Sequence, residues 1–457
     1  MEKGNSGTKM LTKPHIGYMF GGAAQTTIVF LINVTLTYFY TNVIGLNIGR
    51  VTFVMLISRF LDGFSDIIAG TIIDRTKSKY GKARPWLLRM CIPHLIALIA
   101  MYTVPSTSEN LQLIYIFVAY NFANTIVNTM AGLALSSLNS LMTRDPTERS
   151  QLNTMRQFGA PIMELAISAL TIPAANSLGG DQKAWIMVIA CFSIVATLCY
   201  FICFLWSRET APEERCASDE PAPIGKSFLA VLKNKYWYMA LGLWVSGTFN
   251  MTVTSMNLSY YCQYIFGNVN FMSVITTAEK VTTIATVGLL VPFFVKRLSK
   301  RNMTLCGAVV SIVGHALVLI NPVDPTLAVT AAVARGIGMA FGAVVLFAMI
   351  ADCVEYGHWK FGLRTEGIIF CAATVGQKFG QGISQAVAGA LLNGAGFDGT
   401  LAVQSASSMS MITNIYLWVP IIFGFVNVAL VLFYRLDREL PQIMQDLEAR
   451  NATAKTQ

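Results

Sequence analysis

The chain has 457 residues, of which 54% are hydrophobic and 12% are charged, and its formal net charge is +9. Soluble globular proteins average about 25% charged residues, and a single soluble core stops growing near roughly 250–300 residues. The composition therefore excludes an ordinary soluble protein and predicts an all-α membrane protein. Because the basic residues lie in short gaps between apolar runs, we expect no nucleic-acid partner. The scattered cysteines show no metal-ligand spacing, so we expect neither a metal site nor a disulfide.

Twelve apolar runs approach or exceed the length of about 20 residues that spans a bilayer. They lie near 16–42, 49–73, 85–105, 110–142, 152–177, 184–206, 236–266, 270–295, 303–321, 325–351, 366–393 and 409–434. A polar interval rich in proline and acids separates the first six runs from the last six and predicts a linker. We expect an N-terminal six-helix bundle at 1–206, a cytoplasmic linker at 207–235, a C-terminal six-helix bundle at 236–434 and a cytoplasmic tail at 435–457. Two related bundles of this kind are typical of the major facilitator fold.

Lysine and arginine are concentrated in every second short loop. The loop after the second run carries Arg75, Lys77, Lys79, Lys82 and Arg84, whereas residues 266–272 and 394–410 carry no basic residue. Cytoplasmic loops of membrane proteins are the basic ones, so both termini are predicted to be cytoplasmic. The polar residues before the first run do not resemble a signal peptide.

The second apolar run contains three ionisable residues, Arg59, Asp62 and Asp66. Charge inside a bilayer costs at least roughly 2.5–3.5 kcal/mol per residue on insertion scales, so each such residue requires a reason. The spacing places all three on one helical face. Two carboxylates one turn apart repel each other, so the pair is either a proton acceptor or half of a Na⁺ site. The alternative is a purely structural ion pair between Arg59 and an aspartate.

Further ionisable residues lie within other runs. Arg156 and Lys378 come from opposite halves, and we expect them to place two cations across a central cavity. Such an arrangement suits a substrate with a carboxylate, a sulfonate or many hydroxyls. Tyr120 could stack on a sugar face or simply pack in the core. Facing lipid would be costly for a charged side chain. We therefore expect four further residues to face the cavity or a neighbouring helix: Glu164, Glu279, Lys280 and Arg335.

Two loop motifs carry a family resemblance. The first is Asp74-Arg-Thr-Lys-Ser-Lys-Tyr-Gly-Lys-Ala-Arg-Pro-Trp86, and the second is Ala351-Asp-Cys-Val-Glu-Tyr-Gly-His-Trp-Lys-Phe-Gly-Leu-Arg-Thr-Glu-Gly367. Both resemble the glycoside–pentoside–hexuronide:cation symporters, the group that includes the melibiose and glucuronide permeases. The resemblance covers nearly the whole chain. It implies a monomeric transporter in the lipids of the bacterial inner membrane, which moves a sugar with H⁺ or Na⁺ and has no other cofactor.

The resemblance also implies roles for individual residues. Asp62 and Asp66, helped by Thr125 and Ser65, match the positions that hold the coupling cation. Arg156 and Lys378 match cationic positions near the sugar. The two loop motifs match a cytoplasmic gate that holds the halves together, with the residues Asp74, Arg75, Gly81, Lys82, Asp352, Glu355 and Arg364.

The chain departs from the family pattern at several positions. An early acidic residue is missing around Gln25, and Asn128 stands where the melibiose type has an aspartate. We take Gln25, Asn128 and Tyr120 as further substrate-binding candidates. Loss of two acids makes the cavity more positive, which favours an anionic substrate such as a glucuronide, uronic acid or sulfonated sugar. With Ser65 in place of an asparagine, we expect H⁺ over Na⁺.

Several alternatives remain at the level of the sequence. A neutral glycoside or pentoside is the first, and a lysolipid carried by the same fold is the second. An uncoupled facilitator would leave the paired aspartates of the second run unexplained. A membrane-embedded enzyme is disfavoured because the four histidines form no catalytic or metal-binding pairing: His15, His94, His315 and His358.

Overall fold

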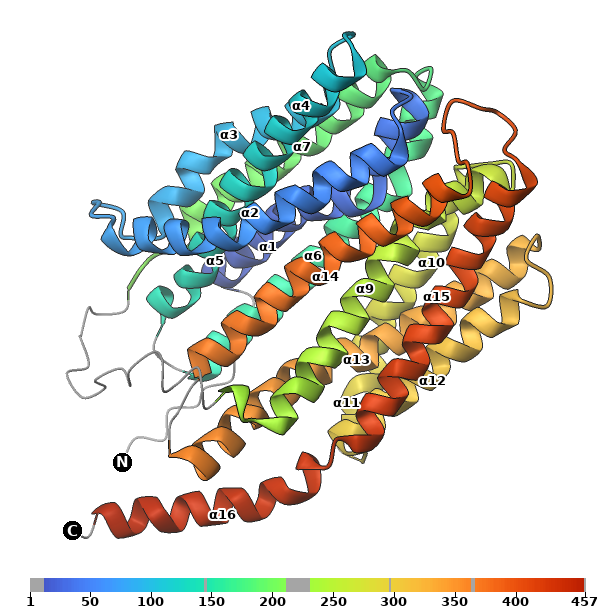
Figure 1. Ribbon diagram of the computed structural model, residues 1–457. Coiled ribbons are helices and arrows are strands. Elements are labelled where there is room, and N and C mark those ends of the chain that lie inside the picture. Colours follow the sequence, from blue (N-terminus) through green and yellow to red (C-terminus); the bar gives the residue numbers. More distant parts are fainter. Residues whose placement is uncertain (1–11, 144–145, 211–230, 296, 363–365, 456–457) are drawn as a thin grey trace. The chain divides into compact units, whose positions relative to one another are not determined.

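The computed structural model describes residues 12–455 except 144–145, 211–230, 296 and 363–365. The described part is built of helices and contains no strand. The chain divides into two compact units, Met1–Glu214 with Asp398–Thr400, and Arg215–Phe397 with Leu401–Gln457 (Figure 1). Each unit is described by itself below.

The first unit contains six helical rods in its described residues. The first and fourth rods each change from α-helix to π-helix within the membrane-length segment. In chain order the elements are α1 (Lys13–Leu31) with η1 (Ile32–Leu36) and η2 (Phe39–Val43), α2 (Ile48–Arg75), α3 (Arg84–Tyr102), α4 (Glu109–Tyr120) with η3 (Asn121–Asn128) and α5 (Thr129–Met142), α6 (Pro146–Ser177) and α7 (Gln182–Trp206).

Packing in the first unit centres on α1, which lies against α6 and α7, while α3 lies against α7. Small residues allow the close approach of α1 and α6. A Cβ atom added to Gly22 would meet the backbone oxygen of Arg156, and one added to Gly159 would meet the backbone oxygen of Met19. This contact holds the Arg156 segment of α6 directly against α1.

The second unit also contains six rods in its described residues, followed by a terminal helix. The rods are α9 (Lys235–Tyr264), α10 (Phe271–Ala285) with η4 (Thr286–Leu290) and α11 (Val291–Val295), α12 (Lys300–Val318), α13 (Pro325–Phe361), α14 (Glu366–Gly394) and α15 (Ala406–Phe433), and the terminal helix is α16 (Leu436–Lys455). The helix α12 packs on α13 and α15, and α9 packs on α14 and α15. The helix α16 packs on α13 and buries Ile443 and Leu447 in the core of this unit.

Several helices begin where a polar side chain accepts a hydrogen bond from the backbone of the first turn, the usual N-cap arrangement. Such caps are Asn47 for α2, Asp181 for α7, Asn234 for α9, Ser299 for α12, Asp324 for α13 and Ser405 for α15. The helix α3 differs, because its own N-cap residue, Ala83, has no capping side chain. The first N–H groups of α3 therefore need acceptors from elsewhere in the chain.

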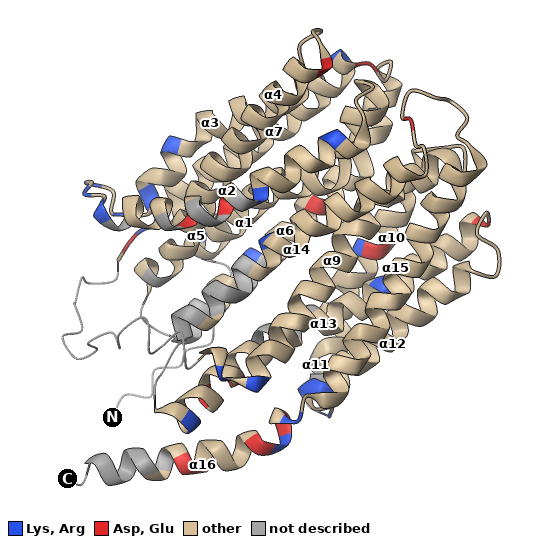
Figure 2. Cartoon of the chain, in the orientation of Figure 1, with Lys and Arg blue, Asp and Glu red and all other residues tan. Residues whose placement is uncertain are grey.

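Eight helical segments of the described part are long and apolar enough to cross a membrane by length and composition. Many charged residues lie toward the helix ends, and exceptions within the apolar segments lie on α2, α6, α10, α13 and α14 (Figure 2). The charge pattern and the span lengths together define a multi-pass membrane protein.

Candidate functional site

The carboxylate of Asp62 is the centre of a polar site inside the first unit. Asp62 lies in the middle of α2 and is 0% exposed. Thr125 Oγ1 donates to Asp62 Oδ1 at 2.5 Å, and Asn124 Nδ2 donates to Asp62 Oδ2 at 2.6 Å. A buried carboxylate is stable only with such donors or an opposite charge beside it. Two members of the predicted cation site, Asp62 and Thr125, are thus in direct contact.

The donors come from the π-helical segment η3, which presents a row of polar side chains to α2. Thr125 Oγ1 also lies 3.0 Å from Asn121 Oδ1, and Asn121 Nδ2 donates to Ser58 Oγ at 2.8 Å. A hydroxyl carries one proton, so Thr125 can donate to either Asp62 or Asn121 but not to both. Short π-helical segments inside longer helices are rare and frequently lie at functional sites. Here the segment brings Asn124 and Thr125 to the two oxygens of one carboxylate.

Arg59 supplies the positive charge next to Asp62. It is 5% exposed, and its Nη1 lies 3.8 Å from Asp62 Oδ2. Its guanidinium group lies 5.8 Å from the centroid of the Tyr120 ring, a cation–π distance. The structural ion pair considered from the sequence is therefore present, in the same place as the candidate coupling carboxylate. Tyr120, a predicted sugar-stacking residue, is fully buried against Arg59.

Ser65 and Asp66 lie one turn further along α2. Ser65 Oγ donates to the backbone oxygen of Asp62 at 2.8 Å and lies 3.5 Å from Thr129 Oγ1. Asp66 is half-buried, whereas Asp62 is fully enclosed. The two aspartates of the predicted pair therefore have different environments, and Asp62 is the one whose two oxygens are held by η3.

Arg156 and Gln25, two predicted substrate-binding residues, form a second polar cluster in the first unit. Arg156 Nη2 donates to Gln25 Oε1 at 2.6 Å, and Arg156 Nη1 donates to Ser136 Oγ at 3.3 Å. These acceptors are neutral, and no carboxylate of the described residues lies within ion-pair distance of Arg156. Asn128, the third candidate, donates from Nδ2 to Asn124 at 3.3 Å. Its buried Oδ1 has no hydrogen-bond partner within the described residues.

Lys378, the remaining substrate candidate, lies half-buried on α14 of the second unit. The expectation that Arg156 and Lys378 face one cavity concerns the two units together and stays a prediction. The second unit has its own buried ion pair, in which Arg335 Nε on α13 lies 3.0 Å from Glu279 Oε2 on α10. Arg335 also donates to the Tyr416 hydroxyl at 3.1 Å. The neighbour of Glu279, Lys280, is buried as well.

The loop after α2 is tied to the end of α7 by Glu209, a residue that the sequence did not single out. The carboxylate of Glu209 accepts hydrogen bonds from the backbone N–H groups of Lys82, Ala83 and Arg84 at 2.8, 2.9 and 2.7 Å. These N–H groups belong to the first residue of α3 and to the two residues before it, so Glu209 caps this helix from a distant part of the chain. Gly81 precedes them with a φ of +102°, which a glycine adopts without strain.

The second unit repeats this construction. Asp437, at the start of α16, accepts a hydrogen bond from the backbone N–H of Arg301 at 2.7 Å, at the start of α12. Arg84 Nε donates to the Phe204 backbone oxygen in the last turn of α7, and Arg301 Nε donates to the Val431 backbone oxygen in the last turn of α15. In each unit an acid just after the sixth rod caps the third rod, and an arginine of the third rod caps the sixth. We call these two arrangements the reciprocal caps.

The predicted gate residues are placed as follows. Lys300 Nζ lies 2.5 Å from Asp352 Oδ2, within the second unit. Arg75 is exposed, and Lys82 and Glu355 are partly buried. The Asp74 side chain and the whole of Arg364 lie outside the described residues. The role of these residues as a gate between the halves stays a prediction.

The fold is that of the major facilitator transporters. It resembles a solved D-xylose-proton symporter with a TM-score of 0.67 over 92% of this chain and 96% of that chain, at 14% identity. The nucleoside transporter NupG matches with a TM-score of 0.62 over 92% of this chain and 100% of that chain, at 13% identity. The chain belongs to the family described as MFS/sugar transport protein, which matches residues 17–438.

Curated relatives extend the family assignment. The isoprimeverose transporter of Lactiplantibacillus pentosus is 31% identical over 92% of this chain and 88% of its own length. The glucuronide carrier protein homolog of Escherichia coli K12 is 25% identical over 95% of both chains. A putative sulfoquinovose importer of the same organism is 24% identical over 97% of this chain and 95% of its own length. The expected resemblance to glycoside symporters is confirmed, and the protein is a membrane transporter of this family rather than an enzyme.

Proposed function

We propose that the protein is a cation-coupled sugar or glycoside symporter, and that Asp62 is the residue that binds the coupling cation. The observation that carries the proposal is a fully buried carboxylate whose oxygens contact a hydroxyl, an amide and a guanidinium group. Binding of a cation or proton at Asp62 would change the balance of charge with Arg59. A change of charge inside a bilayer is large enough to favour one conformation over another.

The proposed coupling cation is a proton. Both oxygens of Asp62 already accept hydrogen bonds, from Thr125 and Asn124, and Arg59 lies close to one of them. A Na⁺ ion requires several oxygen ligands with free lone pairs, whereas a proton requires a single carboxylate oxygen. The arrangement around Asp62 is richer in donors than in free acceptors, which supports H⁺.

The proposed cargo is an anionic sugar. Arg156 donates to the neutral acceptors Gln25 and Ser136, and a sugar carboxylate or sulfonate could replace them. Relatives named for a glucuronide and for sulfoquinovose support this reading. The relative named for isoprimeverose, whose name denotes no acid, supports a neutral glycoside as the second candidate. The site would open to alternate sides as the two six-helix bundles rock about it.

Uptake of a labelled glucuronide into inverted or reconstituted vesicles tests coupling and cargo together. We expect accumulation under an imposed inward H⁺ gradient without Na⁺, and its loss in the Asp62→Asn variant. The control variant Glu109→Gln changes an exposed acid at the start of α4, in a surface ion pair with Arg50, and should transport normally. Accumulation driven by Na⁺ at constant pH would refute the proton, and stronger competition by neutral glycosides than by any anionic sugar would refute the cargo.

Equilibrium exchange separates loss of coupling from loss of the fold. The Asp62→Asn protein should still exchange labelled for unlabelled sugar at equal concentrations, because exchange requires no net cation movement. The Arg156→Gln protein should instead lose affinity for anionic sugars about tenfold or more, the scale of one charge-assisted hydrogen bond.

Location in the bacterial inner membrane with both termini cytoplasmic is part of the proposal, and protease protection of a C-terminal tag in right-side-out vesicles checks the orientation.

A further inference from the structure

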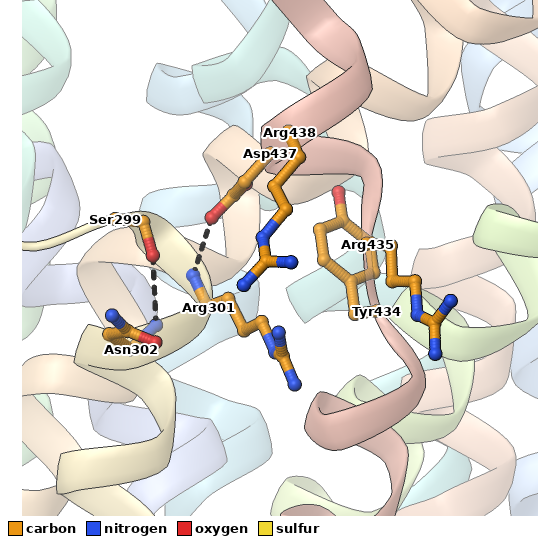
Figure 3. Close-up of a pocket in the computed structure, with 7 residues that line it drawn as sticks. All are labelled: Ser299, Arg301, Asn302, Tyr434, Arg435, Asp437 and Arg438. Atoms are coloured by element: carbon orange, nitrogen blue, oxygen red, sulfur yellow. Dashed lines mark hydrogen bonds between the residues drawn. The ribbon is translucent and has the colours of Figure 1, made fainter.

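A cavity lined by arginines lies at one end of the second unit, away from the Asp62 and Arg156 clusters in the sequence and in a different unit. It has a volume of about 270 Å³ and lies between the start of α12 and the junction of α15 with α16 (Figure 3). Its lining residues are Ser299, Arg301, Asn302, Tyr434, Arg435, Asp437 and Arg438. Three of the seven are arginines and one is an acid, so the lining has a net positive charge.

The positive charge of the cavity is only partly compensated from within the protein. Arg301 uses Nε and Nη2 to donate to the backbone oxygens of Val431 and Leu432. The exposed side chains of Arg435 and Arg438 have no hydrogen-bond or ion-pair partner in the described part of the chain. Figure 3 shows the Arg438 side chain extending toward Arg301, while Arg435 lies on the other side of Tyr434. All three arginines line the cavity, so an anion bound there would reduce the repulsion between their like charges.

The acid of the cavity is already in use, because Asp437 Oδ2 accepts the Arg301 backbone N–H. The cavity therefore fits a ligand that carries an anionic group.

The position of the cavity indicates that this ligand is a lipid. The two residues that end α15, Leu432 and Phe433, have exposed fractions of 47% and 68% and directly precede Tyr434 and Arg435 of the cavity. Apolar side chains of this kind face acyl chains, so the arginines lie at the level of the lipid headgroups on the side predicted to be cytoplasmic. Basic pockets between membrane helices on that side are typical sites for anionic lipid headgroups.

We propose that this cavity binds the headgroup of an anionic phospholipid, with phosphatidylglycerol as the probe. Arg438, together with the exposed Arg435 at the rim and the remaining donors of Arg301, interacts with the phosphate, for which the guanidinium group is well suited. The bound lipid joins the third and sixth rods of the second unit at the point where their reciprocal cap lies. This site is independent of the proposed transport function, and its test uses no transport measurement.

Lipid retention and thermal stability in nanodiscs test the site. The purified protein would be placed in phosphatidylcholine nanodiscs with and without phosphatidylglycerol, and bound lipid would be counted by native mass spectrometry. We expect phosphatidylglycerol to be retained and to raise the melting temperature. An arginine near an anionic headgroup contributes about fivefold in affinity, so the R435Q/R438Q double variant should bind about thirtyfold more weakly. Both changed side chains are exposed, so the variant should fold normally in phosphatidylcholine alone.

The first unit supplies the matched control. Arg208 is an exposed arginine that directly precedes Glu209, the acid of the other reciprocal cap, and Arg435 lies two residues before Asp437. The R208Q variant should retain phosphatidylglycerol as the wild type does. Equal retention by R435Q/R438Q and the wild type would overturn the proposal. An equal rise of melting temperature with inorganic phosphate in phosphatidylcholine nanodiscs would overturn the lipid as the source of the anion.

Discussion

The cap that Glu209 forms on α3 makes a quantitative prediction for the Glu209→Ala variant. The change removes the acceptor of three backbone N–H groups, those of Lys82, Ala83 and Arg84. Ala83 is fully buried, so its N–H group gains no water in exchange. An unsatisfied buried N–H costs about 1–3 kcal/mol, and loss of an N-cap costs about 0.5–2 kcal/mol. We therefore expect the first unit to lose about 2–4 kcal/mol of stability.

Buried cysteines allow this loss to be measured. Cys91, Cys199 and Cys203 are free and buried in the first unit, so a thiol-reactive fluorophore labels them only when the unit opens. The exposed cysteines Cys191 and Cys306 would first be changed to serine to remove the background signal, together with Cys216 and Cys371, whose side chains lie outside the described residues. For a unit of this size, 1 kcal/mol shifts the melting temperature by about 2–4 °C, so the variant should melt roughly 5–15 °C lower.

A surface acid provides the comparison. Glu109 pairs with Arg50 at 2.9 Å, but both side chains are largely exposed, and such pairs contribute about 0–1 kcal/mol. The Glu109→Ala variant should therefore melt within a few degrees of the wild type. If Glu209→Ala melts no lower than Glu109→Ala, the carboxylate does not cap α3 in the folded protein, and the reasoning from hydrogen bonds is refuted.

Three further predictions use the same fluorophore assay. Asp437→Ala should lower the melting temperature of the second unit by roughly 2–8 °C, because it removes the corresponding cap of α12; an unchanged value would show that the two caps are not equivalent. Gly81→Ala should destabilise by about 1 kcal/mol or more, because its φ is +102° and its added Cβ would meet the Glu209 carboxylate. Gly396→Ala, with a φ of +79° and open space around it, should cost less, and equal costs would contradict the contact argument. Glu279→Leu should destabilise by about 3–5 kcal/mol by leaving Arg335 buried without its partner, and the Glu279→Leu/Arg335→Met double variant should recover most of that loss; a double variant as unstable as the single one would exclude an ion pair as the cause.

Some features of the site could be predicted because they follow from the free-energy cost of placing a charged side chain in a bilayer. Two aspartates within an apolar run cannot face lipid, so Asp62 and Asp66 were candidates before any contact was known. Arg156 was a candidate for the same reason, and the structure places it on Gln25. The pairing of Asp62 with Asn124 could not be predicted in this way. It depends on the π-helical segment η3, and no residue pattern in these eight residues distinguishes π-helix from α-helix.

The sequence alone determined the class of the protein: hydrophobic run length predicted membrane helices, the polar interval at 207–235 predicted two sets of six, and two loop motifs indicated the family. These properties are local, because a span or a motif can be recognised within its own residues. The reciprocal caps, the Glu279–Arg335 pair and the arginine-lined cavity were decided only by the tertiary structure. Glu209 and Asp437 each lie more than 120 residues along the chain from the backbone N–H groups that they cap. Their partners are backbone N–H groups, which every residue except proline carries, so only the packing of the rods selects which of them meet.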